Sequence, residues 1–438
     1  MLIELKVYDF KSYREAALPL AELTVLIGAN ASGKSNLLEA LQILSWLARG
    51  RRLSEILYAL KDRQLDVRGP VSRLVHGDGA EFSLSAMLEI DGQILGFVVE
   101  LGLEAQGLRI VSEALLDEET AAKLFLYRVD RESASPYSNE VQVEYNNFAR
   151  GGVKPKIACI NQQAIFTQLT TPARFWSEHK KSQERIPQAS KQLQSALESI
   201  LFLDPAPRRM RDYSFTVERT LQGDGSNVSA VLYDLCEKQQ RKAEVLAFIR
   251  SLPEQDILDL LFLKGPRDEV MVQLTESFGG KSQTYEAALL SDGTLRVLAV
   301  AAAVLSVPEG SLVVIEEIDN GVHPNRARLL LENIQRVARA RKLRVLLTTH
   351  NPALLDAIPV DAIPDVVACY RDPKEGDSRL MPLSKIPDYP ELVAQGPVGQ
   401  LVTRGILDRY LKFPKTPEDK AAQAQEVLAM LHDAPSEP

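Results

Sequence analysis

The stretch of sequence that decides the fold is LTVLIGANASGKSNLLEALQIL, residues 23–44. Its apolar run at residues 24–27 predicts a short buried strand, and the leucines that recur from Leu37 onward predict a helix. Between them, GANASGKS at residues 28–35 fits the pattern GxxxxGK[ST]. This pattern marks a phosphate-binding loop when it follows a strand and precedes a helix, and both conditions hold here. We therefore predict an α/β fold built around this loop.

Each part of the loop has a chemical reason for its residue type. Gly28 and Gly33 allow a turn whose backbone N–H groups point inward, and the helix that follows presents its positive N-terminus to an anion. The ammonium group of Lys34 can reach the outer phosphates, and the hydroxyl of Ser35 can bind Mg²⁺. Together these groups predict that the loop binds ATP with Mg²⁺. The ATP-binding set predicted for this loop also includes Asn30, Ser32 and Asn36.

Two adjacent carboxylates end an apolar strand in SLVVIEEIDN, residues 311–320. In P-loop folds this position holds the acid on the metal side and the base that activates water. We assign Glu316 to the Mg²⁺ shell, directly or through water, and Glu317 to the role of general base. A histidine, His350, ends the next apolar strand in RVLLTTHNP, residues 344–352. Because it lies one strand downstream of the acids, we expect His350 to reach the γ-phosphate.

A second helix start of the anion-binding kind precedes the acidic strand. The segment LLSDGTLR, residues 289–296, places Ser291 and Gly293 in a turn at the beginning of an apolar helix. A phosphate loop, then a Ser-x-Gly helix start, then an acidic strand is the order of motifs in an ABC-type ATPase. In that class two copies of the chain sandwich two nucleotides, so we predict a homodimer or a higher homo-oligomer.

The rest of the chain divides by its hydrophobic periodicity. Period-two alternation between residues 81 and 144 predicts an antiparallel sheet. From residue 171 to about residue 263 the sequence is helical and polar-rich, and the last third alternates strands with helices, which favours parallel strands. We predict an ABC-type ATPase head, a mixed sheet with flanking helices and an antiparallel β subdomain, with an inserted helical lobe. The expected divisions are residues 1–170 and 286–415 for the two halves of the head, 171–285 for the helical lobe, and 416–438 for a C-terminal helix and tail.

Composition limits the classes of protein that remain. The chain has 438 residues, of which 45% are hydrophobic and 25% are charged, as in ordinary globular proteins. No apolar run reaches the ~20 residues that a membrane span needs, so we expect a cytoplasmic protein without a membrane partner. The formal net charge of -8 argues against a surface that is basic throughout, although a local basic stripe could still meet DNA. Three scattered cysteines, Cys159, Cys236 and Cys369, predict neither a zinc site nor a disulfide framework.

In combination these motifs resemble the SMC/RecF/OLD class of ABC-type ATPases. More narrowly, the chain is similar to stand-alone proteins usually described as "AAA family ATPase". Members with long coiled-coil arms need hundreds of heptad residues between the phosphate loop and the Ser-x-Gly turn, and this sequence has only a helical lobe there. OLD nucleases append a TOPRIM domain, whose carboxylate cluster is not found in residues 361–411. The marks of the resemblance are DFKSY at 9–13, Ser35-Asn36, DGSN at 224–227, EEID at 316–319 with the following His323-Pro324, and THNP at 349–352.

The resemblance also implies roles for individual residues. It implies that Ser291 and Gly293 contact the γ-phosphate of the ATP that the partner subunit binds, and that Asp319 communicates across the dimer. It implies a glutamine that touches Mg²⁺ and the attacking water. Gln162 and Gln163 are both candidates for that glutamine, and Gln163 is preferred.

For function, the resemblance implies a Mg²⁺-dependent ATPase in which ATP binding closes a dimer and hydrolysis reopens it. Stand-alone relatives often belong to anti-phage defence modules, so we expect an ATPase or sensor component that acts with a separately encoded effector, a nuclease or a toxin. DNA is a further candidate partner. The alternatives are a RecF-like repair or recombination ATPase that binds DNA, the nucleotide-binding subunit of a membrane transporter, and a non-enzymatic switch with negligible turnover.

Overall fold

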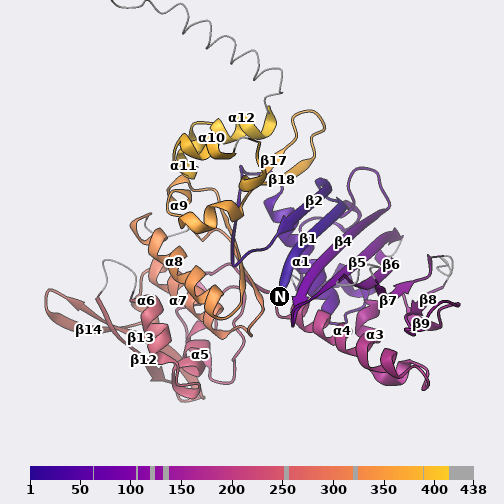
Figure 1. The fold of residues 1–438 in the computed structure, drawn as a ribbon. Helices are drawn as coiled ribbons and strands as arrows, with labels where there is room; N and C mark the ends of the chain where they lie inside the picture. Colours follow the sequence, from indigo (N-terminus) through magenta and orange to yellow (C-terminus); the bar gives the residue numbers. More distant parts are fainter. Residues whose placement is uncertain are drawn as a thin grey trace, which may run out of the picture.

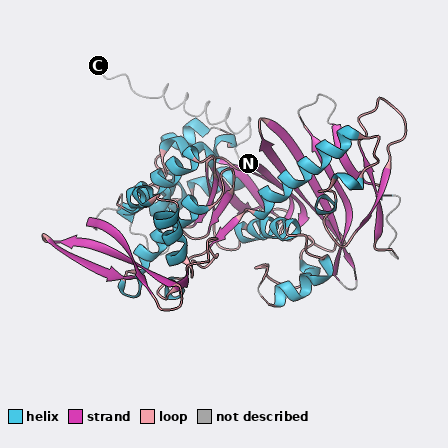
Figure 2. Cartoon of the chain, turned by 90° about the horizontal axis from the view of Figure 1, so that it is seen from below, coloured by secondary structure: helices cyan, strands magenta, loops and turns pink. Residues whose placement is uncertain are grey.

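The chain is described by a computed structural model in which one large antiparallel sheet adjoins a helix-covered, mostly parallel sheet (Figure 1). Seen from below, the long helix α4 runs along the antiparallel side of the molecule, and a smaller antiparallel sheet projects at the opposite end (Figure 2). Within the described residues, no helix is both long and apolar enough to cross a bilayer. The structure describes residues 1–62, 64–104, 107–118, 124–131, 138–250, 256–318, 324–387 and 389–413.

The antiparallel sheet has eight strands in the order β2-β1-β4-β5-β6-β7-β8-β9. It confirms the sheet predicted between residues 81 and 144, since β4 to β8 lie in that segment. Asp91 and Gly92 both have positive φ (51° and 80°) and form the two-residue turn between Ile90 and its partner Gln93. The strands are β1 Leu2–Phe10, β2 Tyr13–Pro19, β4 Glu81–Ile90, β5 Gln93–Glu104, β6 Gly107–Asp117, β7 Leu124–Val129, β8 Glu140–Tyr145 and β9 Lys156–Ile160.

The second sheet has six strands in the order β10-β15-β16-β3-β17-β18. The first five are parallel to their neighbours, and only β18 is antiparallel, so the parallel sheet predicted for the last third of the chain is confirmed. The carboxyl ends of the parallel strands therefore meet at one edge. The strands are β10 Leu201–Leu203, β15 Leu312–Ile315, β16 Arg344–Thr349, β3 Leu23–Ile27, β17 Val366–Arg371 and β18 Ser378–Pro382.

The central strands of this sheet are buried on both faces, which explains their unbroken apolar runs. In β15, Leu312 and Val314 face the hydrophobic core shared with the antiparallel sheet, whereas Val313 and Ile315 face a second core among helices. The sheet thus separates two cores. The α-helices of the described residues are α1 Lys34–Ala48, α2 Ile56–Lys61, α3 Ile165–Gln168, α4 Lys180–Glu198, α5 Val228–Tyr233, α6 Lys242–Ile249, α7 Asp292–Ser306, α8 Pro324–Ala340, α9 Pro352–Leu355, α10 Tyr389–Ala394, α11 Val398–Thr403 and α12 Ile406–Lys412.

The segment 171–285, expected as a helical lobe, needs correction. It contains α4, α5 and α6, but it also contributes β10 to the main sheet and forms a small antiparallel sheet around β13. In β13 the buried Val272, Leu274 and Glu276 alternate with the more exposed polar residues Gln273, Thr275 and Ser277, and this period of two indicates a strand. The predicted helix at 416–438 lies outside the described residues. The strands of the small sheet are β11 Ser214–Phe215, β12 Asp256–Lys264, β13 Glu269–Phe278 and β14 Lys281–Glu286.

A buried carboxylate ties the antiparallel sheet to the segment that leads into α3. Glu113 on β6 is fully buried and accepts hydrogen bonds from the backbone N–H groups of Ile165 and Phe166, each at 2.8 Å, and from the Tyr127 hydroxyl at 2.7 Å. Burial raises the pKa of Glu113 to about 7, against these hydrogen bonds, which lower it. The side chain of Glu113 therefore fixes the start of α3, and with it the loop that precedes this helix, against the antiparallel sheet.

This carboxylate predicts a specific dependence of stability on pH. Its pKa is higher in the folded chain than the ordinary value of 4.5, so its contribution to stability is full below pH 4.5 and is lost as pH rises through about 7. Glu113→Gln has no proton to lose. Its melting temperature relative to wild type should therefore rise between about pH 5 and about pH 8, by the equivalent of up to about 3 kcal/mol. Thermal unfolding at both pH values tests this, with the exposed Glu15→Gln as control, and a pH-independent difference would contradict it.

Candidate functional site

The loop at residues 28–35 follows β3 directly and needs glycine at two points. Gly28 and Gly33 have φ of 152° and 121°. A Cβ atom at Gly28 would lie 2.2 Å from the carbonyl oxygen of Cys369, and one at Gly33 would lie 2.4 Å from the Ser378 hydroxyl. A side chain at either position would therefore displace the loop from β17 and β18, against which it packs.

Side chains beneath the loop hold it in place. The hydroxyl of Ser378 donates to the carbonyl oxygen of Ser32 at 2.5 Å, and the amide of Asn36 donates to the Ser12 hydroxyl at 2.7 Å. The hydroxyl of Tyr13 lies 3.2 Å from the sulfur of Cys369 under the same loop. Ser12 and Tyr13 belong to the DFKSY stretch, so that stretch acts as a support for the loop. Asn36 was predicted to bind ATP. In the structure its hydrogen bond to Ser12 joins α1 to the turn between β1 and β2.

Lys34 begins α1 and lies over the loop. Its ammonium group donates to the carbonyl oxygens of Gly28 and Ala29, the second at 3.1 Å. Burial lowers the pKa of Lys34, while neighbouring groups such as Glu317 raise it. The first turn of α1 carries no acidic side chain, so its positive end is left to an external anion.

The paired acids follow β15, and their backbones are held differently. The N–H of Glu316 donates to the carbonyl oxygen of Leu203 at 3.0 Å, and the N–H of Glu317 donates to the Thr348 hydroxyl at 3.1 Å. Glu317 has φ of 45°, a conformation that non-glycine residues adopt at a cost and that is concentrated at functional sites. Burial, together with the nearby carboxylates of Asp204 and Asp66, raises the pKa of Glu316 to about 7. A cation beside Glu316 would remove this penalty.

The order of the parallel strands brings these groups together. Because β3, β16 and β15 are neighbours, the residues after their carboxyl ends share one edge, and they line a pocket of about 520 Å³. Gly28, whose carbonyl oxygen contacts Lys34, begins the loop that forms its wall. The predicted residues that line this pocket are Asn30, Ser32, Gly33, Lys34, Ser35, Asn36, Glu316, Glu317 and His350.

Three basic residues that were not predicted as site residues also line the pocket. Lys11 pairs with the buried carboxylate of Glu39 on α1 and donates to the carbonyl oxygen of Arg68 at 2.7 Å. Arg68 pairs with the other oxygen of Glu39 at 2.7 Å, and Arg371 donates to the carbonyl oxygen of Ala31 at 3.2 Å. With Lys34, they give the pocket the positive charge that a triphosphate requires. Lys11 was part of a recognised stretch, but nothing in the sequence pointed to Arg68 or Arg371.

The Ser-x-Gly turn lies elsewhere. The Ser291 hydroxyl accepts the N–H of Thr294 at 3.1 Å and so caps α7. Arg211 fixes the turn by donating to the carbonyl oxygen of Leu290 at 2.7 Å and pairing with Asp292 at 2.6 Å. Within the described part of the chain, neither Ser291 nor Gly293 lines the pocket at Lys34. The turn is thus preorganised, but not for the nucleotide site of its own subunit. The predicted Asp319 lies outside the described residues.

The preference for Gln163 as the glutamine beside Mg²⁺ needs correction. Its amide donates to the carbonyl oxygen of Gly50 at 2.9 Å, just beyond the C-terminal end of α1. Lys34 stands at the other end of this 15-residue helix, about 22 Å away at 1.5 Å per residue. Gln162 instead donates to the carbonyl oxygen of Leu108 at 3.2 Å. Asp204 directly follows β10, the strand beside β15, and therefore lies next to Glu316.

This placement predicts different effects for two substitutions. Gln163→Ala should leave ATP turnover within about twofold of wild type, because its side chain contacts only the far end of α1. His350→Ala should lower turnover about tenfold or more, because it removes a polar group that faces the phosphate pocket. Steady-state phosphate release at saturating ATP measures both. Equal losses in the two variants would contradict the placement of Gln163.

Fold and site together define a P-loop ATP-binding protein whose motifs stand in the order of ABC-type ATPases. The chain belongs to the family described as "AAA domain, putative AbiEii toxin, Type IV TA system", which matches residues 23–356, well over half of its length. This match and the relatives below confirm the resemblance to SMC/RecF-class ABC-type ATPases.

The relatives match over shorter segments. "DNA replication and repair protein RecF" of Gloeobacter violaceus is 48% identical over 69 residues, 16% of this chain and 16% of that protein. "Structural maintenance of chromosomes protein 1" of Arabidopsis thaliana is 34% identical over 101 residues, 21% of this chain and 8% of that protein. The chain therefore spans only a small part of either relative. A solved structure of an SMC head bound to the C-winged helix domain of ScpA aligns with 87% of this chain and 96% of its own, at 11% identity and a TM-score of 0.47.

Proposed function

We propose that this chain hydrolyses ATP with Mg²⁺ in a dimer in which each nucleotide lies between two copies. One observation carries the proposal. The phosphate loop, the acid pair and His350 share one pocket, whereas the Ser291 turn, a preorganised helix start, does not line it. Two copies arranged head to tail would bring each turn to the other copy's pocket. Phosphate release by wild type, with Lys34→Ala as control, tests the hydrolysis.

The residues of the pocket suit this reaction. Backbone N–H groups of the loop and the ammonium group of Lys34 would hold the phosphates, and Ser35 with Glu316 would hold Mg²⁺. Bound there, Mg²⁺ would supply positive charge that offsets the negative charge developing during transfer. Glu317 would take the proton of the attacking water, and its position is fixed by the hydrogen bond between its backbone and Thr348. His350 would donate a hydrogen bond to the γ-phosphate.

The proposed head is assembled from two separated parts of the chain, residues 1–170 and 286–415, with residues 171–285 inserted between them. Support comes from the main sheet, in which β3 of the first part pairs with β16 and β17 of the second. The insertion packs against α7, which the Ser291 turn begins. A change in the nucleotide would thereby reach the inserted segment.

We further propose that the protein works in the cytoplasm.

For the biological role, we propose the ATPase or sensor component of an anti-phage defence system with a separately encoded effector, a nuclease or a toxin. The family's description, which names a toxin of a type IV TA system, supports this choice over a housekeeping role. Co-expression of the chain with its neighbouring gene in a phage-challenged host tests it. Protection should require both genes and should be lost with Glu317→Gln. Unchanged plaque counts would contradict the proposal.

A RecF-like repair ATPase is the second candidate, supported by the 48% identity to a RecF protein over 69 residues. This role requires DNA binding by the purified chain without any partner. Binding should then weaken steeply between about 50 mM and 200 mM salt, because counterions are released from the phosphates. Fluorescence anisotropy with duplex and junction DNA, with and without ATP, distinguishes this role from the first.

A further inference from the structure

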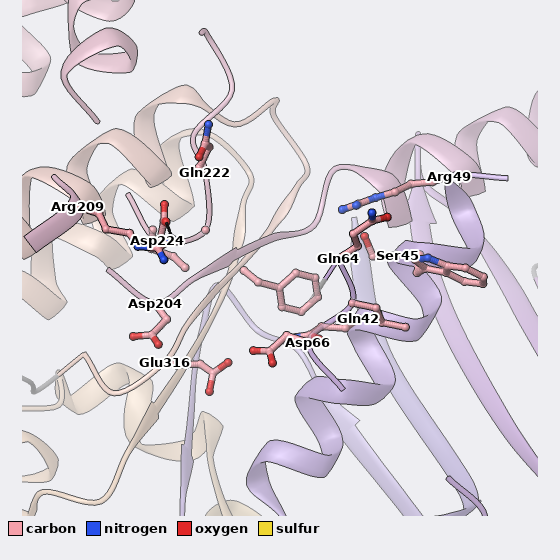
Figure 3. A pocket seen from close by; sticks show the side chains of 15 residues that line it. Gln42, Ser45, Arg49, Gln64, Asp66, Asp204, Arg209, Gln222, Asp224 and Glu316 are labelled. Atoms are coloured by element: carbon pink, nitrogen blue, oxygen red, sulfur yellow. Dashed lines mark hydrogen bonds and ion pairs between the residues drawn. The ribbon is translucent and has the colours of Figure 1, made fainter. Parts of the chain in front are cut away.

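A second cavity, of about 570 Å³, lies beside the nucleotide pocket (Figure 3). One wall is the C-terminal half of α1 and the loop around Asp66, and the other is the chain that follows β10 and the segment 222–224. Among the lining residues that the structure describes, only Glu316 belongs to both cavities. We call this second cavity the α1 cleft.

Two polar side chains on the α1 wall are buried without a partner. Ser45 is 1% exposed, and its hydroxyl oxygen has no hydrogen bond to any described residue. The side-chain oxygen of Gln42, one turn earlier on the same helix, is also buried and unpaired in the described structure. Both residues line the α1 cleft, and Figure 3 shows them on the same wall. A buried polar atom without a partner costs about 1–3 kcal/mol, so such atoms call for a ligand that supplies the missing hydrogen bond.

The charged groups of the α1 cleft are unbalanced. Asp224 is paired with Arg209 at 2.9 Å, so these two charges offset each other. The carboxylates of Asp66, Asp204 and Glu316 remain, and Figure 3 shows them near one another along one side of the cleft. The remaining cation among the lining residues is Arg49, on the α1 wall. The lining residues thus carry an excess of negative charge, and Arg296 and Arg68 act on Asp204 and Glu316 from outside the lining.

The chemistry of these groups restricts the ligand. Carboxylates and the side-chain oxygen of Gln42 accept hydrogen bonds, and an unpaired hydroxyl such as that of Ser45 can accept them too. Trp46 and Phe202 add aromatic surface to the same lining, which suits an aliphatic stem or the face of a cation. The described residues hold no group of three His, Cys, Asp or Glu side chains that could hold a metal ion, and a hydrogen-bond donor, which a bare metal ion lacks, is what the unpaired oxygens of Ser45 and Gln42 require. A donor-rich organic cation meets all of these conditions.

We propose that the α1 cleft binds an aliphatic cation with several N–H donors, that is, a polyamine or an arginine or lysine side chain of a partner. The ammonium or guanidinium groups occupy the end near Asp66 and Asp204, and the stem packs against Trp46. One donor reaches the Ser45 hydroxyl. Because Glu316 lines both cavities, a cation bound in the α1 cleft lies beside a side chain of the nucleotide pocket. Binding of the cation requires no ATP hydrolysis, so it does not depend on the proposed function.

The two tryptophans of the chain offer a direct measurement. Trp176→Phe removes the exposed tryptophan and leaves Trp46, in the α1 cleft, as the only emitter. In EDTA and without nucleotide, spermidine should change the Trp46 emission saturably, with half-saturation below about 1 mM. An acetylated tri-arginine peptide forms the second arm. Tighter binding of spermidine identifies a free polyamine, and tighter binding of the peptide identifies a partner side chain.

Matched variants show whether the change comes from the α1 cleft. Ser45→Ala and Asp66→Asn should each weaken binding about tenfold, the equivalent of about 1.4 kcal/mol, whereas Asp78→Asn, on an exposed loop, should not. Ser45→Ala should also raise the melting temperature without ligand, since it removes an unpaired buried hydroxyl, and this excludes misfolding as the cause of weaker binding. No saturable change, an equal response to Na⁺ at the same ionic strength, or undiminished binding by Ser45→Ala would each overturn the proposal.

Discussion

Replacing Glu317 by glutamine is expected to lower ATP turnover by about 100-fold or more while leaving ATP binding intact. The amide has the shape of the carboxylate but cannot take the proton of the attacking water. The unusual backbone of this residue, with φ of 45° and its N–H bonded to Thr348, does not involve the side chain and should survive the change. Nucleotide should then stay bound, and the dimer that surrounds it should persist.

Phosphate release, nucleotide binding and size-exclusion chromatography with ATP and Mg²⁺ measure the three parts of this expectation. Lys34→Ala is the control, because it should lose ATP binding and remain monomeric under the same conditions. If Glu317→Gln eluted as a monomer with ATP bound, the sandwich arrangement would be wrong. If its turnover matched that of wild type, Glu317 would not be the base.

The sequence predicted those parts of the site in which a chemically active residue stands at the end of a recognisable strand. The phosphate loop, the acid pair and His350 each stand at the end of an apolar strand, and alternation of strands with helices makes those strands parallel. Parallel neighbours place their carboxyl ends at one edge. Three short motifs far apart in the chain could therefore be placed in one pocket without knowledge of any contact between them.

The parts that could not be predicted depend on contacts between distant segments. Arg68 lines the nucleotide pocket and shares Glu39 with Lys11, and neither pairing leaves a periodic signal in the sequence. Gln163 was preferred by its place in the order of motifs, but the buried carboxylate of Glu113 holds the loop before α3 near the far end of α1. Order along the chain carries no information on that distance.

The helical lobe failed as a prediction for a different reason. Polar helices dominate residues 171–250, and the period-two signal of β13 comes only after them. The prediction of a helical lobe therefore extended the pattern of residues 171–250 to all of residues 171–285. The correction matters for mechanism, because β10, at the edge of the main sheet, is what places Asp204 beside Glu316 and opens the α1 cleft next to the nucleotide pocket.

The position of the Ser291 turn makes the nucleotide site testable as two halves. In each copy the pocket at Lys34 and the turn at Ser291 are separate, and in the proposed dimer a complete site takes one half from each of two copies. Lys34→Ala removes the first half, and Ser291→Arg blocks the second with a bulky side chain at the start of α7. Each variant alone should be inactive, because every composite site that two copies of it could form carries the same lesion.

Mixed dimers of these two variants should recover activity. One of their sites joins the intact pocket of the Ser291→Arg copy to the intact turn of the Lys34→Ala copy. The isolated mixed dimer should therefore show about half of the turnover of a wild-type dimer, since one of its two sites is complete. Two affinity tags isolate the mixed dimer for the measurement. Lys34→Ala paired with Glu317→Gln is the control and should recover nothing, because both lesions lie in the same half. If the first mixture also stayed inactive although mixed dimers were isolated, Ser291 would not act on the partner's nucleotide, and the proposed assembly would have to be abandoned.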